Sequence, residues 1–380
     1  MTTPKLAIAG GGTGGHIAPA LALAEEFIAR FGPGSVHFLC GGNELERGML
    51  SHAGHDFTTL PISRPTGTLR SKATTVITTA MAVPAARRAL KNFSATMLAC
   101  VGGYASLPGA MAASLLRLPV FLLESNAVPG KVTRHVSRFA KVCYAHMPMT
   151  RSLDCPVEVR GNPVRASFLD TVDKAAARRA LGLDPRVPTL LVIGGSQGAG
   201  ALNDAILSAA PTLKSLPGGI QILHLTGPDD LERANWAYRE AGIASRTAAF
   251  THNTATWMAA SDVALTRSGA GTISELLTLG VPGLYVPYPH AADDHQLANA
   301  RWVASNGAGV VLAQDALDAP RLREALLHLL PGSEQREPAV KAALALSRPF
   351  ACGDILDAML AQMGFSDGLD SADQNHRAAA

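Results

Sequence analysis

One unit recurs along the whole chain: a short apolar run, a glycine-rich turn or loop, and an Ala/Leu-rich stretch with helical spacing. The first copy reads LAIAGGGTGGHIAPALALAEEF, and a second series starts afresh at LLVIGGSQGAGALN. Strand–helix alternation of this length is typical of parallel sheets that are covered by helices on both faces. We therefore predict an α/β protein with two Rossmann-like sheets.

The length of 380 residues favours two domains over one core. Prolines gather between the two series, so we place the boundary there and expect domains at residues 1–160 and 161–364. Residues 365–380 are polar and aperiodic and are expected to form a disordered tail. The expected strands are 6–9, 36–39, 96–101, 120–123 and 142–144 in the first domain, and 189–193, 220–225, 263–266 and 283–286 in the second.

Composition narrows the class of protein. The five cysteines are scattered without a C-x-x-C pair, which favours a reducing compartment without a disulfide framework or structural metal. Met1 to Lys5 run straight into a strand, so no leader peptide is expected. Residues 92–116 carry no charge, but paired glycines and a proline interrupt them, which predicts strand, turn and helix rather than a membrane span.

The charge is unevenly distributed. Residues 1–165 carry 17 Lys and Arg against 8 Asp and Glu, whereas residues 166–380 carry 16 against 22. No acidic residue occurs between Asp56 and Glu124, although seven basic residues do. Such a block indicates an anionic partner for the first domain.

The glycine turns indicate where ligands bind. Each precedes a helix, and a helix N-terminus offers free N–H groups and a positive dipole end to an anion. Gly10, Gly12 and Gly15 fit G-x-G-x-x-G, a weak signal alone, but similar turns follow strands in both halves. Ligands of such sheets lie beyond the carboxyl ends of the strands, so we expect one site between the domains.

Three polar residues near these turns are candidates for chemistry. His16 stands at a helix N-terminus, where the dipole disfavours a charged ring, so it can accept a proton; capping the turn is the alternative. Glu275, in LTRSGAGTISELL, can accept hydrogen bonds from ribose hydroxyls, or it can simply complement the helix dipole. Glu124 follows a strand and either converges on the same cleft or only ends that strand.

In combination, GGTGGH, GGYAS, ESN, GNPVR, GGSQGA, SGAGTISE and AADDHQ resemble the bacterial peptidoglycan N-acetylglucosaminyltransferases that make lipid II. The resemblance runs from about Leu6 to Asn299. It implies a GT-B fold and inverting transfer of GlcNAc from UDP-GlcNAc to the MurNAc C4 hydroxyl of undecaprenyl-diphosphate-linked MurNAc-pentapeptide. It also implies a peripheral enzyme at the cytoplasmic face of the plasma membrane, with no cofactor, no metal and no nucleic-acid partner.

Carried over by position, the resemblance assigns His16, Tyr104 and Glu124 to the acceptor and catalytic side. Donor contacts are implied for Thr13, Gly14, Gly15, Asn126, Arg165, Ser196, Thr251, Ala270, Gly271, Thr272, Ile273, Ser274, Glu275 and Gln296. One departure concerns Leu123 and Ser125, where the family often has His and Gln, and this puts local acceptor contacts in doubt. Thr251 replaces an aliphatic residue of some relatives, a change that backbone recognition of uracil would survive.

A lipid-linked acceptor predicts a membrane-docking surface near residues 62–91. There Val76, Ile77, Ala80 and Met81 can form an apolar patch. The flanking basic residues are Arg70, Lys72, Arg87, Arg88 and Lys91, which suit an anionic membrane surface. The alternative is a helix that faces the core and has a solvated basic edge, and Pro84 speaks against one straight helix.

Three other functions remain open from the sequence. A UDP-sugar epimerase shares the two-domain plan but does not need the acid-free basic segment. A dinucleotide oxidoreductase requires an acidic residue after the second strand, where Cys40 and Gly41 stand. A non-catalytic membrane-assembly protein would not need glycine turns in both domains together with Glu275.

Overall fold

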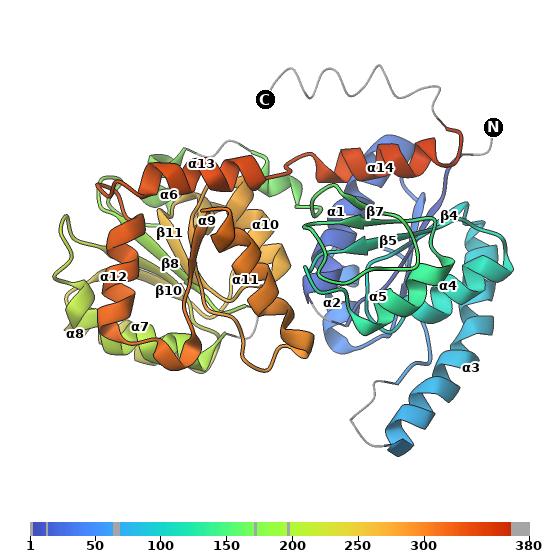
Figure 1. The fold of residues 1–380 in the computed structure, drawn as a ribbon, viewed down its shortest axis with the longest axis horizontal. Helices are drawn as coiled ribbons and strands as arrows, with labels where there is room; N and C mark the ends of the chain where they lie inside the picture. The colour runs from blue at the N-terminus through green and yellow to red at the C-terminus, as the bar shows by residue number, and fades with distance from the viewer. Residues whose placement is uncertain (1–2, 13, 64–68, 171–172, 196–197, 366–380) are drawn as a thin grey trace.

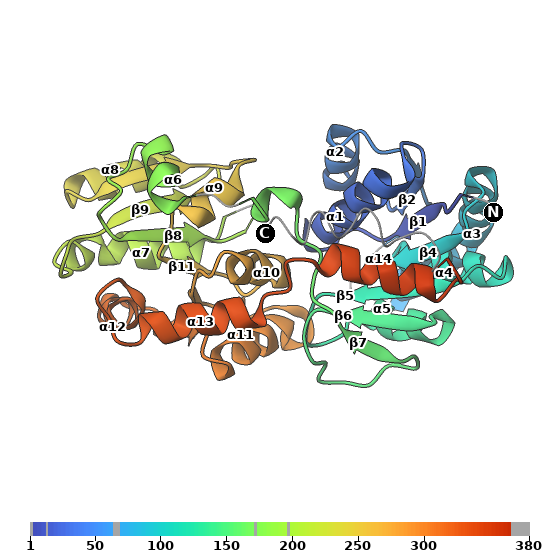
Figure 2. The same ribbon diagram turned by 90° about the horizontal axis from the view of Figure 1, so that it is seen from above.

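The computed structural model describes residues 3–12, 14–63, 69–170, 173–195 and 198–365. These residues form two α/β units that lie side by side (Figures 1 and 2). Thr13, Ser196 and residues 366–380 of the expected tail lie outside the described residues.

The first unit holds a seven-stranded parallel sheet in the order β3-β2-β1-β4-β5-β6-β7. Its central strands are continuously buried, as in β1 with the sequence LAIA, because helices cover both faces. Its elements are β1 (Leu6–Ala9), α1 (Gly14–Phe31), β2 (Val36–Cys40), α2 (Glu44–His52), β3 (Phe57–Thr59), α3 (Leu69–Phe93), β4 (Met97–Cys100), α4 (Ser106–Leu115), β5 (Val120–Glu124), α5 (Lys131–Val136), η1 (Ser137–Phe139), β6 (Val142–Ala145) and β7 (Val157–Val159).

The second unit holds a six-stranded parallel sheet in the order β10-β9-β8-β11-β12-β13. The elements up to its fourth strand are η2 (Ala166–Phe168), α6 (Lys174–Ala180), β8 (Thr189–Ile193), α7 (Gly200–Leu213), β9 (Gln221–Leu225), α8 (Leu231–Glu240), β10 (Ala244–Ala248), α9 (Thr254–Ala259) and β11 (Val263–Thr266). They are followed by α10 (Ala270–Thr278), β12 (Gly283–Tyr285), η3 (Ala292–Asp294), α11 (His295–Ser305), β13 (Gly309–Val311), η4 (Gln314–Ala316), α12 (Ala319–Leu329), α13 (Arg336–Leu346) and α14 (Ala351–Ala361).

The prediction of two parallel sheets is confirmed, and all nine expected strands are present within a few residues of their expected bounds. Four strands were not expected: β3, β7, β10 and β13. They are the four edge strands of the two sheets. The charge-free stretch 92–116 folds as predicted, with β4, a glycine turn and α4.

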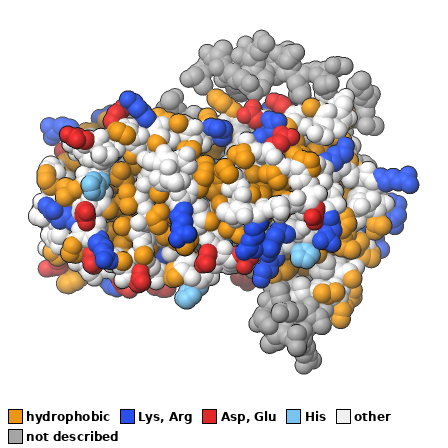
Figure 3. Space-filling view, in the orientation of Figure 1, with side chains coloured by type: hydrophobic (Ala, Val, Ile, Leu, Met, Phe, Trp, Pro, Cys, Tyr) orange, Lys and Arg blue, Asp and Glu red, His pale blue; other side chains and the backbone are white. Residues whose placement is uncertain are grey.

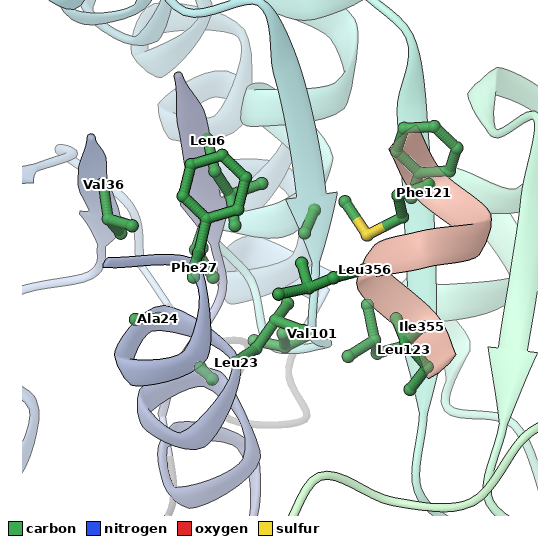
Figure 4. Close-up of a cluster of buried hydrophobic side chains, with 14 of the residues drawn as sticks. Leu6, Leu23, Ala24, Phe27, Val36, Val101, Phe121, Leu123, Ile355 and Leu356 are labelled. Carbon is green, nitrogen blue, oxygen red and sulfur yellow. The ribbon is translucent and has the colours of Figure 1, made fainter. Parts of the chain in front are cut away.

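The expected end of the second domain is wrong. The last helix, α14, returns to the first unit and packs beside α1 (Figure 2). Ile355 and Leu356 enter the same buried cluster as Leu6 and Phe27 (Figure 4), and Phe365, the first residue of the expected tail, packs against that cluster. The first unit therefore consists of the N-terminal residues together with α14, because α14 buries its apolar face against the first sheet and not the second.

Helix α3 departs from the sequence-based interpretation in another way. It is a single helix over 25 residues with Pro84 inside it. Its N-terminal part projects from the body of the first unit (Figure 1), and its C-terminal part packs on α4. No helix in the described part of the chain is long and apolar enough to cross a membrane.

Candidate active site between the two sheets

Helices α1 and α10, which follow glycine turns in different units, contact each other across the domain boundary. Each begins at the carboxyl end of a central strand, β1 or β11. The N-terminus of each helix has free backbone N–H groups, so each can bind an anion at the edge of its own sheet. The two helices bring the two units together, and a site shared between the domains stays a prediction.

The second unit contributes a cavity of about 480 Å³. The turns after β8 and β11 line it, with Arg267, Thr272, Tyr288, Gln296 and Gln314. Its volume is in the range of small-molecule and nucleotide sites. Gln296 is oriented here, because its Oε1 accepts a hydrogen bond of 2.9 Å from the Tyr288 backbone N–H, which leaves its NH₂ group to donate.

Glu275 lies about one turn after Thr272 on α10 and forms an ion pair with Arg165. The Arg165 Nη2 donates to Glu275 Oε1 at 3.1 Å and to Thr254 Oγ1 at 2.8 Å. Burial raises the pKa of Glu275, and the charge of Arg165 opposes that rise. The two residues that the sequence assigned to one ligand therefore form an ion pair with each other.

His16 is fixed by both glycine turns of the first unit. Its Nδ1 lies 3.0 Å from the Gly11 carbonyl oxygen, which can only accept, so Nδ1 carries the proton. In a neutral ring the lone pair then belongs to Nε2. A Cβ on Gly102 would stand 3.0 Å from ring atoms Cδ2 and Nε2. The turn that contains Gly102 therefore restricts the position of the ring from the other side.

Glu124 is occupied by its own loop. Its Oε1 accepts from the backbone N–H and the Nδ2 of Asn126, and its Oε2 accepts from Gly130 N and Thr133 Oγ1. With four protein donors on a buried carboxylate, we treat Glu124 as a positioning residue instead of a catalytic one. Leu123, at the first position that departs from the family pattern, is buried in the core.

The structure does not bring every expected residue to the cavity. Ile273 lies in the core of the second unit, and Ser274 bonds to His146, so neither side chain lines the cavity. Thr251 lies in the loop after β10, outside the cavity lining, where its Oγ1 accepts from Asn253 N. Gly14 and Gly15 are the first residues of α1, and Tyr104 lies in the turn after β4; all three are at least partly exposed.

Two residues at the domain boundary were missed. Asn299, fully buried on α11, bonds to the loop after β5, and His146, after β6, contacts α10. Asn299 stands three residues after AADDHQ, at the end of the resemblance, but no sequence signal marked its side chain as buried between domains. Among the described residues, no group of three or more His, Cys, Asp and Glu is placed to hold a metal ion.

Comparison with known proteins agrees with this architecture. Residues 6–145 match the glycosyltransferase family 28 N-terminal domain, and residues 189–351 match the family 28 C-terminal domain. A curated relative from Nitratidesulfovibrio vulgaris is 37% identical over 92% of this chain and 95% of its own length, and one from Geobacter sulfurreducens is 35% identical over 94% and 98%. Both are named UDP-N-acetylglucosamine–N-acetylmuramyl-(pentapeptide) pyrophosphoryl-undecaprenol N-acetylglucosamine transferase.

The chain belongs to the family of these N-acetylglucosamine transferases. The crystal structure of Acinetobacter baumannii MurG matches it with a TM-score of 0.73 and 28% identity, over 93% of this chain and 99% of that one. As a family 28 glycosyltransferase, the chain has the GT-B fold that the sequence predicted. Family membership favours a transferase over the UDP-sugar epimerase alternative.

His146 gives a testable property of the boundary. Burial and, secondarily, Arg348 lower its pKa to about 4, and its Nδ1 is buried without a partner. Because the unfolded chain binds this proton near pH 6.5 and the folded chain does not, stability falls as the pH drops from about 6.5 towards 4. The loss from this one residue is ~3 kcal/mol.

We expect His146→Gln, which can keep the donor to Ser274 Oγ, to lose less stability than the wild type between pH 7 and pH 4.5. Urea unfolding at several pH values measures the difference. His224, which is buried within the second unit and whose pKa is also lowered by burial, remains in both proteins and cancels. Parallel stability curves for the two proteins would show that His146 is not the group that titrates.

Proposed function

We propose that this chain transfers GlcNAc from UDP-GlcNAc, with inversion, to the C4 hydroxyl of undecaprenyl-diphosphate-linked MurNAc-pentapeptide, which converts lipid I to lipid II. The observation that carries the proposal is the cavity at the turns after β8 and β11. Helix α10, which carries Glu275, contacts α1, the helix that carries His16. The names of the relatives supply the substrates.

On the donor side, the cavity of the second unit is the proposed UDP site. Glu275 accepts hydrogen bonds from the ribose hydroxyls, and the backbone N–H groups at the start of α10 face the diphosphate. The NH₂ group of Gln296 donates to a donor hydroxyl. The negative charge that develops on the leaving UDP is stabilised by these N–H groups and by Arg165, so we expect no requirement for a metal ion.

On the acceptor side, the C4 hydroxyl oxygen attacks the anomeric carbon of GlcNAc while the bond from that carbon to the UDP oxygen breaks. The hydroxyl proton goes to His16 Nε2, the nitrogen with the lone pair when Nδ1–H is bonded to Gly11 O. Gly102, in the turn after β4, lies beside the His16 ring, and Tyr104 of the same turn contributes to acceptor binding. Gly14 and Gly15, at the N-terminus of α1, face the leaving group.

A radiolabelled transfer assay tests the function. Label from UDP-GlcNAc should appear in the lipid-linked acceptor, and equal rates in EDTA would support metal independence. An epimerase would alter UDP-GlcNAc without acceptor, an oxidoreductase would require a nicotinamide cofactor, and a scaffold would do neither. Absence of label in the lipid, with the acceptor shown to be intact, would overturn the proposal.

The donor site predicts a binding defect. Glu275→Ala should lower UDP affinity by ~2–4 kcal/mol because charge-assisted hydrogen bonds to the ribose are lost. Glu275→Gln should cost less, since one acceptor oxygen remains. Isothermal calorimetry measures both, with Glu240→Ala, an exposed carboxylate on α8 of the same unit, as the matched control. Wild-type UDP affinity in Glu275→Ala would refute the ribose assignment.

The proton transfer predicts a kinetic defect at His16. General bases contribute 10²–10⁴-fold, so His16→Ala should lower kcat well over tenfold, with UDP affinity nearly unchanged. His16→Asn can keep a donor for the Gly11 carbonyl but has no basic nitrogen, and it should be as slow as the alanine variant. If His16→Asn turned over at the wild-type rate, the ring would serve only to hold the turn.

We also propose that the first unit docks peripherally on the anionic cytoplasmic face of the plasma membrane through α3. Val76, Ile77 and Met81 are 70%, 59% and 65% exposed, and Ala80 is exposed between them. These side chains lie on the projecting part of α3, where Figure 3 shows hydrophobic atoms at the surface. Such exposure of large apolar side chains favours docking over the alternative of a core-facing helix.

The basic residues of α3 supply the electrostatic attraction to the anionic membrane. Arg87, Arg88 and Lys91 are exposed, whereas the side chains of Arg70 and Lys72 lie outside the described part of the chain. Each cation near an anionic leaflet contributes about 1 kcal/mol, so several of them hold the domain reversibly. Docking in this way places the acceptor side of the site near the plane of the lipid headgroups.

Charge reversal of Arg87, Arg88 and Lys91 should weaken binding to anionic vesicles and slow turnover of lipid-embedded acceptor, while a soluble short-chain acceptor is unaffected. Vesicle sedimentation and the transfer assay measure the two effects. Reversal of three exposed cations of the second unit, Arg179, Arg186 and Lys341, changes the net charge equally and serves as the control. Equal losses on both acceptors would mean that α3 touches the substrate and not the membrane.

A further inference from the structure

A single amide side chain joins the two units beside the site. Asn299, on α11 of the second unit, is 0% exposed. Its Oδ1 accepts from the Ala127 backbone N–H at 2.9 Å, and its Nδ2 donates to Asn126 Oδ1 at 3.0 Å. The same Nδ2 donates to the Ser268 carbonyl at 3.1 Å, within the second unit.

These three bonds fix the relative position of two ligand-binding segments. Asn126 and Ala127 belong to the loop after β5, and Ser268 to the turn between β11 and α10. Ser268 is tied in turn to the Gln296 carbonyl through its Oγ at 2.7 Å. Asn299 is thus bonded at once to the first-unit loop that carries Asn126 and to the turn that lines the cavity.

The bonds also fix which way the Asn126 amide faces. Asn299 Nδ2 holds the Asn126 oxygen, and Glu124 Oε1 accepts from the Asn126 nitrogen at 3.2 Å. A flipped Asn126 amide would set its oxygen against the Glu124 carboxylate and its NH₂ against the Asn299 NH₂. The observed orientation therefore leaves one Asn126 N–H hydrogen for a ligand.

We propose that Asn299 is a positioning residue for the donor sugar: it orients the Asn126 amide and fixes the position of the loop after β5 relative to the turn between β11 and α10. The inference rests on the proposed function and on the contact of Asn126 with UDP-GlcNAc that the family resemblance implies. Asn299 touches no substrate in this scheme, and its effect on transfer passes through Asn126. UDP alone is held by the second unit, so the effect is specific to the sugar and to turnover.

The decisive test is a double-mutant cycle on kcat/KM for UDP-GlcNAc. Asn299→Ala and Asn126→Ala should each lower it at least tenfold, with UDP affinity changed less than threefold. The double variant should be no more than threefold worse than the poorer single variant, because both changes remove the same contact. Multiplicative losses in the double variant would overturn the inference.

Asn203 supplies the matched control. It is a buried amide with three bonds, to His224, Thr226 and Asp230, all within the second unit. Asn203→Ala should destabilise the fold through the same loss of buried hydrogen bonds, but its effect on kcat/KM should multiply with that of Asn126→Ala. Coupling of Asn203 to Asn126 as strong as that of Asn299 would mean that the cycle reports general destabilisation only, and the inference would fail.

Asn299→Asp separates orientation from folding. The aspartate keeps an acceptor for Ala127 N–H but replaces the donor that Asn126 Oδ1 needs with an oxygen. Hydrogen exchange at the Ala127 amide should therefore stay near the wild-type rate in Asn299→Asp and rise at least tenfold in Asn299→Ala, whereas both variants lose kcat/KM. Wild-type kcat/KM in Asn299→Asp would overturn the inference.

These measurements also distinguish failure of the positioning role from failure of the proposed function. If the wild-type chain transfers GlcNAc but Asn299 and Asn126 act independently, the positioning role alone is wrong. If the wild-type chain transfers no GlcNAc to the lipid-linked acceptor, the proposed function is wrong and the positioning role falls with it.

Discussion

The close contact between the turns after β1 and β4 determines the geometry of the first unit. A Cβ on Gly103 would stand 2.2 Å from the Gly11 carbonyl oxygen, and φ at Gly103 is +80°, so only glycine fits there. The same carbonyl receives His16 Nδ1–H, and Gly11 N–H donates to the Gly102 carbonyl at 3.2 Å. Both turns must approach to this distance before His16 has a defined orientation, so the glycines set the position of this side chain through backbone packing.

The position of the second unit relative to the first depends on two chain crossings that lie against each other. Residues 160–165 lead out of the first unit, and residues 347–350 lead back to α14. A Cβ on Gly161 would stand 2.4 Å from the Arg348 Cβ, and Cys352 Sγ contacts the Val164 carbonyl at 3.8 Å. Because the C-terminal helix is part of the first core, the second unit is anchored at both of its ends, and the bonds of Asn299 and His146 act on segments that are already close.

The sequence predicted the interior of both sheets and missed their edges. Central strands such as β8, TLLVI, are buried on both faces and read as continuous apolar runs. The edge strand β10, ASRTA, is partly exposed along its length, and β7, VEV, is exposed at both ends, so neither has an apolar run to detect. The predicted end of the second domain was wrong for a related reason. The helical pattern of α14 is clear, but periodicity shows only that a helix buries one face, and it does not show against which sheet that face packs.

The site shows the same limit at the level of single side chains. The turn before α10 led to Glu275, and the family resemblance led to Arg165, as separate ligand contacts. Neither predicted the ion pair between them, which depends on how the linker passes α10. That pair bears on the proposed binding of UDP by Glu275. Burial disfavours the charged form of Glu275, and Arg165 offsets this, so a ligand that engages Glu275 does best when it also gives Arg165 a new anionic partner. A nucleoside diphosphate meets both demands, with ribose hydroxyls for the carboxylate and a diphosphate for the guanidinium, whereas a nucleoside without phosphates meets only the first.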